Sequence, residues 1–132
     1  MSWGKKTLKH VLICCESGSR PKGGLENVEE VKEGYVPSLG AEHLSGNGGF
    51  NFTNLKTVNS SFYEGMKTGK IQRNDVLIVK DGATTGKTSF VDENFPYTSA
   101  GINEHIFCLR ANPEIIFPRF LFYFLASNVG NQ

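Results

Sequence analysis

The sequence lacks any long hydrophobic run. The apolar stretches nearest its two ends are Val11–Cys15 and Phe120–Ala126, whereas a helix that spans a bilayer needs about 20 residues. The first stretch is also too short to be the core of a secretory signal peptide. We therefore expect neither a membrane anchor nor a secretion signal, and we expect a cytoplasmic location.

Cysteine is scarce as well. The three cysteines include an adjacent pair, Cys14 and Cys15, and none belongs to a C-x-x-C motif. An odd count without paired spacing is typical of a reduced, cytosolic protein. The three histidines are scattered and do not have the spacing of metal ligands. The sequence predicts no metal site.

A strong charge of either sign is absent, since the formal net charge is +1. No global field marks a nucleic-acid-binding protein. Locally, five basic and two acidic residues lie between Gly65 and Phe90, and six acidic and three basic residues lie between Glu16 and Glu42. Such runs are most often solvated faces, so this asymmetry alone identifies no partner.

Glycine, by contrast, is abundant, with 15 residues in a chain of 132. This content favours many turns and few long helices. The length is that of one ordinary domain, and 39% apolar residues are enough for a core. We expect a single domain over residues 1–132, with a helix from about residue 117 that begins a longer spacer, so that the chain is a fragment of a longer polypeptide.

The stretch DGATTGKT, residues 81–88, is similar to a phosphate-binding loop. Such a loop has four residues between its first glycine and the Gly-Lys pair and then opens a helix. Only three residues separate Gly82 from Gly86, and the β-branched and aromatic run that follows favours a strand. We therefore predict a hairpin whose first strand covers residues 76–80 and whose connection exposes Thr84, Thr85 and Lys87.

Helices are predicted near both ends and at one internal site. Thr7 could cap a helix with Leu8, Val11, Leu12 and Cys15 on one face. Ser61 and Glu64 form a possible capping box, with Phe62 and Met66 buried, Gly69 just past the end, and Lys67 and Lys70 at the exit. Pro118 suits the first turn of a C-terminal helix with a wide apolar arc, made of Phe120, Leu121, Phe122, Phe124 and Leu125, opposite Arg119, Tyr123 and Ala126.

Loops and strands fill the rest of the chain. Residues 17–24 must be irregular around Pro21, and Arg20 and Lys22 there form either a phosphate clamp or an exposed loop without a partner. A short strand is expected to stop at Pro37, and residues 45–52 form a glycine loop. The segment 105–109 is apolar on both faces, with Ile106 and Cys108 on one of them, which indicates a central strand.

Five motifs, in order along the chain, resemble the target recognition domain of a type I restriction–modification specificity subunit. They cover essentially the whole sequence: TLKHV, SGSRPKGG, GYVPSLGAEHL, GKIQRNDVLIVKDGATTGKTSFV and NPEIIFPRFLFYFLAS. Together with the strand pattern, the resemblance implies an α+β fold. We expect a twisted, mostly antiparallel or mixed sheet, partly barrel-like, with short helices and flanking helices at the two termini.

The sequence departs from the family pattern at two points. Asn74 stands where the family usually has glycine before Asp75, but asparagine also tolerates a left-handed backbone. Such subunits usually carry two recognition domains and long spacer helices, whereas this chain has one domain.

The resemblance implies a protein that binds duplex DNA, reads one half of a bipartite site and performs no catalysis itself. Modification subunits that use S-adenosylmethionine, and a restriction subunit that uses ATP and Mg, would act beside it, and this chain would hold no cofactor. Phosphate contacts position such a domain and base contacts specify the site. The expected phosphate contacts are Arg20, Lys22, Lys67, Lys70 and Lys87. The expected base contacts are Lys80, Thr84 and Thr85, with Asn103 and His105 behind them and Asn47 as a further candidate.

Two other functions remain possible from the residues. The aromatic C-terminal helix and the glycine loops could form a protein-interaction module that has no role in DNA binding. The glycine loop could also belong to a nucleotide hydrolase. For Thr84 and Thr85, hydroxyls bonded to their own backbone are at least as common as base contacts.

Overall fold

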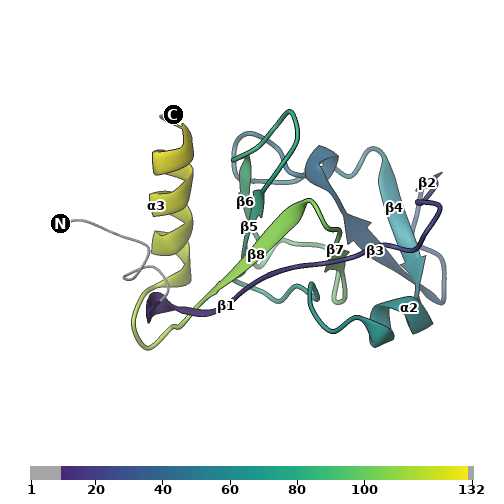
Figure 1. The fold of residues 1–132 in the computed structure, drawn as a ribbon, viewed down its shortest axis with the longest axis horizontal. Helices are drawn as coiled ribbons and strands as arrows, with labels where there is room; N and C mark the ends of the chain where they lie inside the picture. Colours follow the sequence, from purple (N-terminus) through teal and green to yellow (C-terminus); the bar gives the residue numbers. More distant parts are fainter. Residues whose placement is uncertain (1–9, 131–132) are drawn as a thin grey trace.

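The strands form two separate four-stranded sheets. The computed structural model describes residues 10–130 (Figure 1). The first sheet has the order β1-β8-β5-β6, with bounds Leu12–Ser17, Ile106–Ala111, Val76–Val79 and Thr88–Phe90. The second has the order β2-β4-β3-β7, with bounds Asn27–Val28, Leu55–Asn59, Tyr35–Leu39 and Gly101–Ile102. Both sheets are open.

Besides His10 and Val11, which are helical at the start of the described residues, residues 12–130 contain three helices. They are the 3-10 helix η1 (Ala41–His43), α2 (Ser60–Gly65) and α3 (Pro118–Gly130). The β3–β7 pair is parallel and all other strand pairs are antiparallel. The predicted α+β class with a mixed sheet is confirmed. No helix within residues 10–130 is long and apolar enough to cross a membrane.

Strand β8 is the centre of the first sheet, as its two apolar faces predicted. It pairs with β1 on one side, where Cys15 faces Leu109, and with β5 on the other, where Leu77 faces Cys108. Ile106 and Cys108 point into the larger core and are fully buried. Leu109 points to the opposite face and packs under α3.

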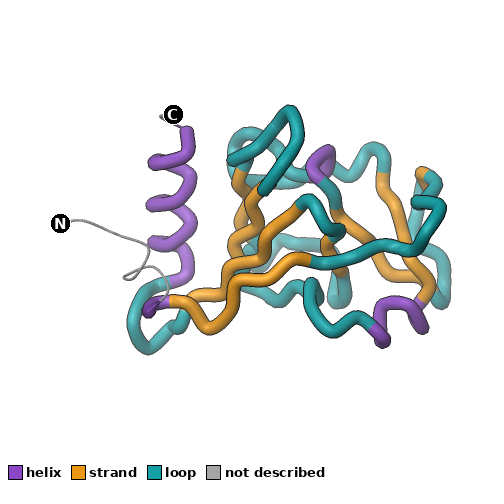
Figure 2. Tube along the Cα trace, in the orientation of Figure 1, coloured by secondary structure: helices purple, strands orange, loops and turns teal. Residues whose placement is uncertain are grey.

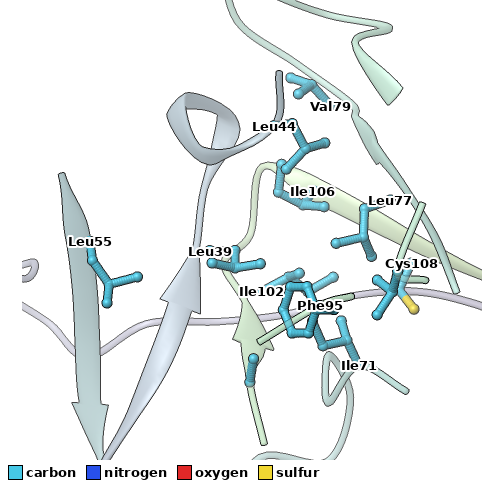
Figure 3. Close-up of a cluster of buried hydrophobic side chains, with 12 residues drawn as sticks. Leu39, Leu44, Leu55, Ile71, Leu77, Val79, Phe95, Ile102, Ile106 and Cys108 are labelled. Carbon is cyan, nitrogen blue, oxygen red and sulfur yellow. The ribbon is translucent and has the colours of Figure 1, made fainter. Parts of the chain in front are cut away.

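The larger core lies between the two sheets (Figure 3). It brings Leu39, from the second sheet, and Leu44, which follows η1, against Leu77, Ile106 and Cys108 from the first sheet. An aromatic group of Phe50, Phe52, Phe95 and Tyr97 closes one side of this core through stacked and edge-to-face contacts. The core therefore fixes the two sheets to each other without any disulfide, and all three cysteines are free.

Helix α3 covers the other face of the first sheet. Leu121 is fully buried there against Val76, Phe90 and Leu109, and Phe122 stacks at an angle on Phe90 with ring centroids 5.5 Å apart. Pro118 begins this helix, as expected. The sequence pattern predicts Phe120 on the buried arc, and this prediction is wrong because half of its surface is exposed. The contact with the sheet is narrower than the apolar arc because only one helix face meets β5, β6 and β8.

Near the N-terminus, the prediction of a helix is wrong from Leu12 onwards. Residues 12–17 form strand β1, which pairs with residues 107–111 of β8. Thr7 and Leu8 lie outside the described residues. The spacing of Val11, Leu12 and Cys15 fitted a helix, but the long-range pairing with β8 overrides this local pattern.

Two further local predictions are corrected. Strand β3 continues through Pro37 to Leu39 instead of stopping at the proline. Its pairing with β7 begins only at Ser38, so the missing N–H of Pro37 removes no bond to β7. Helix α2 is capped by Asn59, whose side chain accepts the Phe62 N–H at 2.8 Å, rather than by Ser61. The helix already ends at Gly65, so Gly69 is not its terminating glycine.

Candidate nucleic-acid interface

The predicted β5–β6 hairpin is present, and its connection is a compact glycine-containing turn. Gly82 and Gly86 have φ values of 96° and 94°, which favour glycine. The Gly86 N–H donates to Val79 O at 2.7 Å, and the Val79 N–H donates to Lys87 O at 2.9 Å. These bonds join the two ends of the connection where the strands stop. Strand β6 follows directly from Thr88. The connection therefore does not open a helix, and it lacks the geometry of a phosphate-binding loop.

The two threonines of this connection differ in their environment. Thr85 Oγ1 donates to Gly82 O at 2.7 Å, so its hydroxyl stabilises the turn itself. Thr84 is exposed at the tip, and its backbone carbonyl accepts the Lys87 N–H at 3.1 Å. Thr84 is therefore the better placed of the two to contact a ligand, while Thr85 shapes the loop.

A second glycine loop, residues 45–50, lies beside the hairpin connection. Figure 2 shows both loops at the same end of the molecule, away from α2. The Phe90 N–H donates to Gly48 O at 2.9 Å, and Ser89 Oγ donates to Gly49 O at 2.6 Å. These bonds attach the loop to strand β6, so the two loops are held in a fixed relation.

The two loops and α3 enclose an open groove of about 550 Å³. Its lining combines small and hydroxyl residues of both loops with an aromatic wall from the helix. The residues are Gly46, Asn47, Gly48, Thr84, Thr85, Gly86, Lys87, Thr88, Phe122, Tyr123 and Ala126. The groove thus brings together four of the residues that were predicted from the sequence to contact DNA, from two segments almost 40 positions apart. They are Asn47, Thr84, Thr85 and Lys87. That α3 forms the third wall of the groove was not predicted from the sequence.

A group of charged residues lies at the base of the hairpin connection. The Lys80 N–H donates to His105 O at 2.9 Å, and Lys80 Nζ lies 5.1 Å above the Phe107 ring. His105 Nδ1 lies 2.5 Å from Asp81 Oδ1, and both side chains are about half exposed. Lys80 and His105 are therefore neighbours of the groove, although Asp81 already occupies one ring nitrogen of His105.

Asn103 is buried and holds the neighbouring backbone in place. Its Oδ1 accepts the His105 N–H at 2.9 Å, and its own N–H and C=O bond to Leu39 and Gly18. Asn103 is therefore a buried residue that orders the backbone before His105.

Arg20 and Lys22 lie on the loop that follows β1. Arg20 Nε is 3.1 Å from one oxygen of Glu104 and donates a hydrogen bond to the other at 3.2 Å. This pair is more than a third exposed, so solvent screens it and the arginine can exchange partners at little cost. Lys22 is exposed.

Lys67 and Lys70 belong to the segment after α2, at the end of the molecule opposite the hairpin connection (Figure 1). Lys70 Nζ donates to Glu64 O at 3.2 Å and lies 5.1 Å from the Tyr63 ring. Lys67 is exposed. The structure therefore does not bring these two lysines to the groove.

A buried ion pair at the start of the hairpin was not foreseen from the sequence. Asp75 is fully buried, and its two oxygens accept hydrogen bonds from Arg110 Nε at 2.8 Å and Arg110 Nη2 at 2.9 Å. Oδ2 also accepts the Gln72 N–H at 2.7 Å and the Cys108 thiol at 3.1 Å. The hydrogen bond to Asp75 raises the pKa of Arg110, and burial next to Asp75 raises the pKa of Cys108. In the sequence, the only sign of this ion pair is Arg110 itself, a charged residue in the otherwise apolar segment 106–111.

The described residues offer no group of His, Cys, Asp and Glu side chains that could hold a metal ion. His43 is fully buried, with Nδ1 accepting the Gly40 N–H at 2.9 Å and Nε2 lying 2.8 Å from Asn54 O. It is a core histidine that is satisfied by the backbone.

Comparison with known families agrees with the motif order. The family model described as "Type I restriction modification DNA specificity domain" matches residues 3–132. No curated protein matches the chain.

Proposed function

The chain belongs to the type I restriction modification DNA specificity family, and we propose that it binds duplex DNA and reads one half of a bipartite site. In this proposal residues 1–132 act as a single target recognition domain. The observation that carries it is the groove, where Asn47, Thr84 and Lys87 from two fixed glycine loops lie together on one open edge.

Side chains that carry hydroxyl, amide or ammonium groups contact base edges and phosphates in protein–DNA complexes. Thr84 and Lys80 would contact bases, with Thr85, Asn103 and His105 supporting the loop. Lys87, Arg20 and Lys22 would contact phosphates, while Lys67 and Lys70 would reach the duplex only if it extends around the molecule. An open groove fits an extended polymer better than an enclosed pocket would.

The chain itself would make or break no covalent bond. Methyl transfer with S-adenosylmethionine, and ATP- and Mg-dependent restriction, would belong to modification and restriction subunits bound to it. The aromatic residues exposed near and on α3 and outside the groove offer a surface for such a subunit: Phe117 is 82% exposed and Phe120 51%. Large exposed apolar groups commonly mark contact surfaces.

Fluorescence-anisotropy titration of labelled duplexes over a range of salt concentrations tests the proposal. With about four or five phosphates neutralised, the slope of log K against log salt should be near −4. Lys87→Glu should weaken binding about tenfold and reduce the slope by about one.

Lys32→Glu is the matched control, because Lys32 is exposed on the acidic loop before β3 and carries the same charge. Its effect should be small, since screening limits charge effects to about 8 Å at physiological salt. Phe117→Ser should leave DNA binding unchanged. Binding without salt dependence, or equal losses for Lys87→Glu and Lys32→Glu, would contradict the proposal. If only the protein-interaction alternative holds, Phe117→Ser and not Lys87→Glu should impair function.

A further inference from the structure

The loop of residues 45–50 presents one side chain, Asn47, whose two polar ends have different roles. Asn47 Oδ1 accepts hydrogen bonds from Ser45 Oγ at 2.5 Å and from the Gly49 N–H at 3.1 Å. The Nδ2 amino group takes part in neither bond. The acceptor end of the amide is thus used inside the loop, and the donor end is the part left to face a ligand.

The contacts of its neighbour Gly48 hold Asn47 in place. Next to it, Gly48 forms a bridge to Ser89 and has φ 92°, and a Cβ at that position would lie 2.6 Å from the Phe122 ring. The loop therefore lies tightly between β6 and α3. An exposed amide on a fixed loop loses little conformational freedom on binding, which favours its use in recognition.

Asn47 lines the same groove as Thr84 and Lys87. A duplex that places a phosphate at Lys87 and a base edge at Thr84 would run past Asn47. The N–H donors of the Asn47 Nδ2 amino group determine which base edge this side chain could bind. Both hydrogen-bonding atoms that guanine presents in the major groove, O6 and N7, are acceptors, whereas cytosine presents an amino donor.

We propose that Asn47 is a further specificity-determining residue beside Thr84 and Lys80, which reads an acceptor edge, best supplied by guanine, through its Nδ2 amino group. This inference rests on the proposed DNA-binding function and adds the loop of residues 45–50 to the recognition surface. The usual pairing of asparagine with adenine, which needs both ends of the amide, is not available here because Oδ1 is already used.

Asn47→Asp is the informative variant. It keeps an oxygen to accept the Ser45 and Gly49 bonds and replaces the outward amino group with an acceptor. Asn51→Asp is the matched control, because Asn51 is also exposed and its Oδ1 also accepts two bonds, from Thr53 N–H at 3.0 Å and Thr53 Oγ1 at 2.6 Å. Asn51 does not line the groove, and the charge change is the same.

The experiment selects bound sequences from a library of synthetic duplexes with a randomised central segment, using the full chain at low salt. The wild-type protein should enrich a short sequence that contains guanine at the position read by Asn47. Asn47→Asp should change the preference at that position by roughly tenfold towards cytosine or adenine, which present amino donors, and leave the other positions unchanged. Asn51→Asp should leave every position unchanged.

The outcomes are distinguishable. A wild-type chain that binds no duplex in the library would overturn the proposed function and this inference with it. A wild-type chain that selects a sequence, together with an Asn47→Asp variant that selects the same one, would overturn the inference alone. Such a result would mean that Asn47 only shapes its loop. Circular dichroism of both variants confirms that the fold is retained.

Discussion

Arg110, on the central strand β8, holds the fully buried carboxylate of Asp75 at the start of β5 through two hydrogen bonds of 2.8 and 2.9 Å. Arg110 Nη2 also donates to Lys70 O at 3.2 Å. One guanidinium thus fixes the segment that leads into the hairpin, and the hairpin carries Thr84 and Lys87 to the groove.

Asp75→Asn should be strongly destabilising. The asparagine has the same shape, but it leaves the half-buried Arg110 charge without a counterion, which costs about 3 kcal/mol or more. Urea unfolding measures this loss. Asp92→Asn is the control, because the Asp92 carboxylate accepts the Asn94 N–H at an exposed turn, a bond that the asparagine oxygen can also accept, and its replacement should cost less than about 1 kcal/mol. Equal midpoints for the two variants would contradict the importance of the ion pair.

Gly48→Ala should disturb the groove directly. The new methyl group would lie 2.6 Å from the Phe122 ring at a position with φ 92°, a conformation that costs a non-glycine residue about 1–3 kcal/mol. Thermal unfolding and DNA titration should both show the loss. Gly46→Ala, in the same loop, has nothing within 4 Å of its added Cβ and no positive φ. It should leave the stability within about 0.5 kcal/mol of the wild type, and a comparable loss there would argue against the steric explanation.

Asn74 tests the turn before β5. It is the only non-glycine residue with positive φ in the described chain, at 75°. Asn74→Gly should be neutral or slightly stabilising, whereas Asn74→Ala should cost about 1 kcal/mol. Asn94→Ala, at an exposed residue without positive φ, serves as the control in the same chemical-unfolding series. An alanine at position 74 that is as stable as glycine would contradict this explanation.

Stability should fall at alkaline pH. Burial, together with a hydrogen bond to Glu16, raises the pKa of the Cys14 thiol from 9.0 to about 11, and burial also raises the pKa of Cys108. Because the folded state holds these protons more tightly, the unfolded state releases its thiol protons first as the pH rises. The stabilising contribution of Cys14 is complete below about pH 9 and is lost progressively towards about pH 11.

Urea midpoints in reducing buffer at about pH 8 and about pH 10.5 measure this effect. Cys14→Ser removes one of the titrating thiols and should show a smaller decline between the two conditions. Identical declines in the wild type and the variant would show that Cys14 does not contribute.

Local chemistry made the hairpin region predictable. Branched residues on both sides of Gly82 and Gly86 specify two strands and a turn, and Asn74 adopts the left-handed backbone expected of it. The apolar alternation around Ile106 likewise identified a central strand. These signals are contained within a few neighbouring residues, so a single sequence reveals them.

The remaining features depend on residues that are distant in the chain. Leu12 and Cys15 fit a helical spacing, and only pairing with residues 107–111 makes their segment a strand. The Asp75–Arg110 pair spans 35 positions. The groove needs Phe122 against Gly48. None of these relationships leaves a local periodicity, so the groove wall and the buried ion pair emerge only from the three-dimensional structure.

The order of the first sheet has a consequence for how the chain acquires its structure during synthesis. In this sheet β1 pairs only with β8, and the paired residues are 90 to 99 positions apart in the chain. Without β8, β5 and β6 are a two-stranded ribbon, which is marginally stable in water. The sheet therefore cannot assemble until Ala111 has left the ribosome. Until then, Leu77 and the apolar residues around it remain accessible to chaperones and to neighbouring nascent chains.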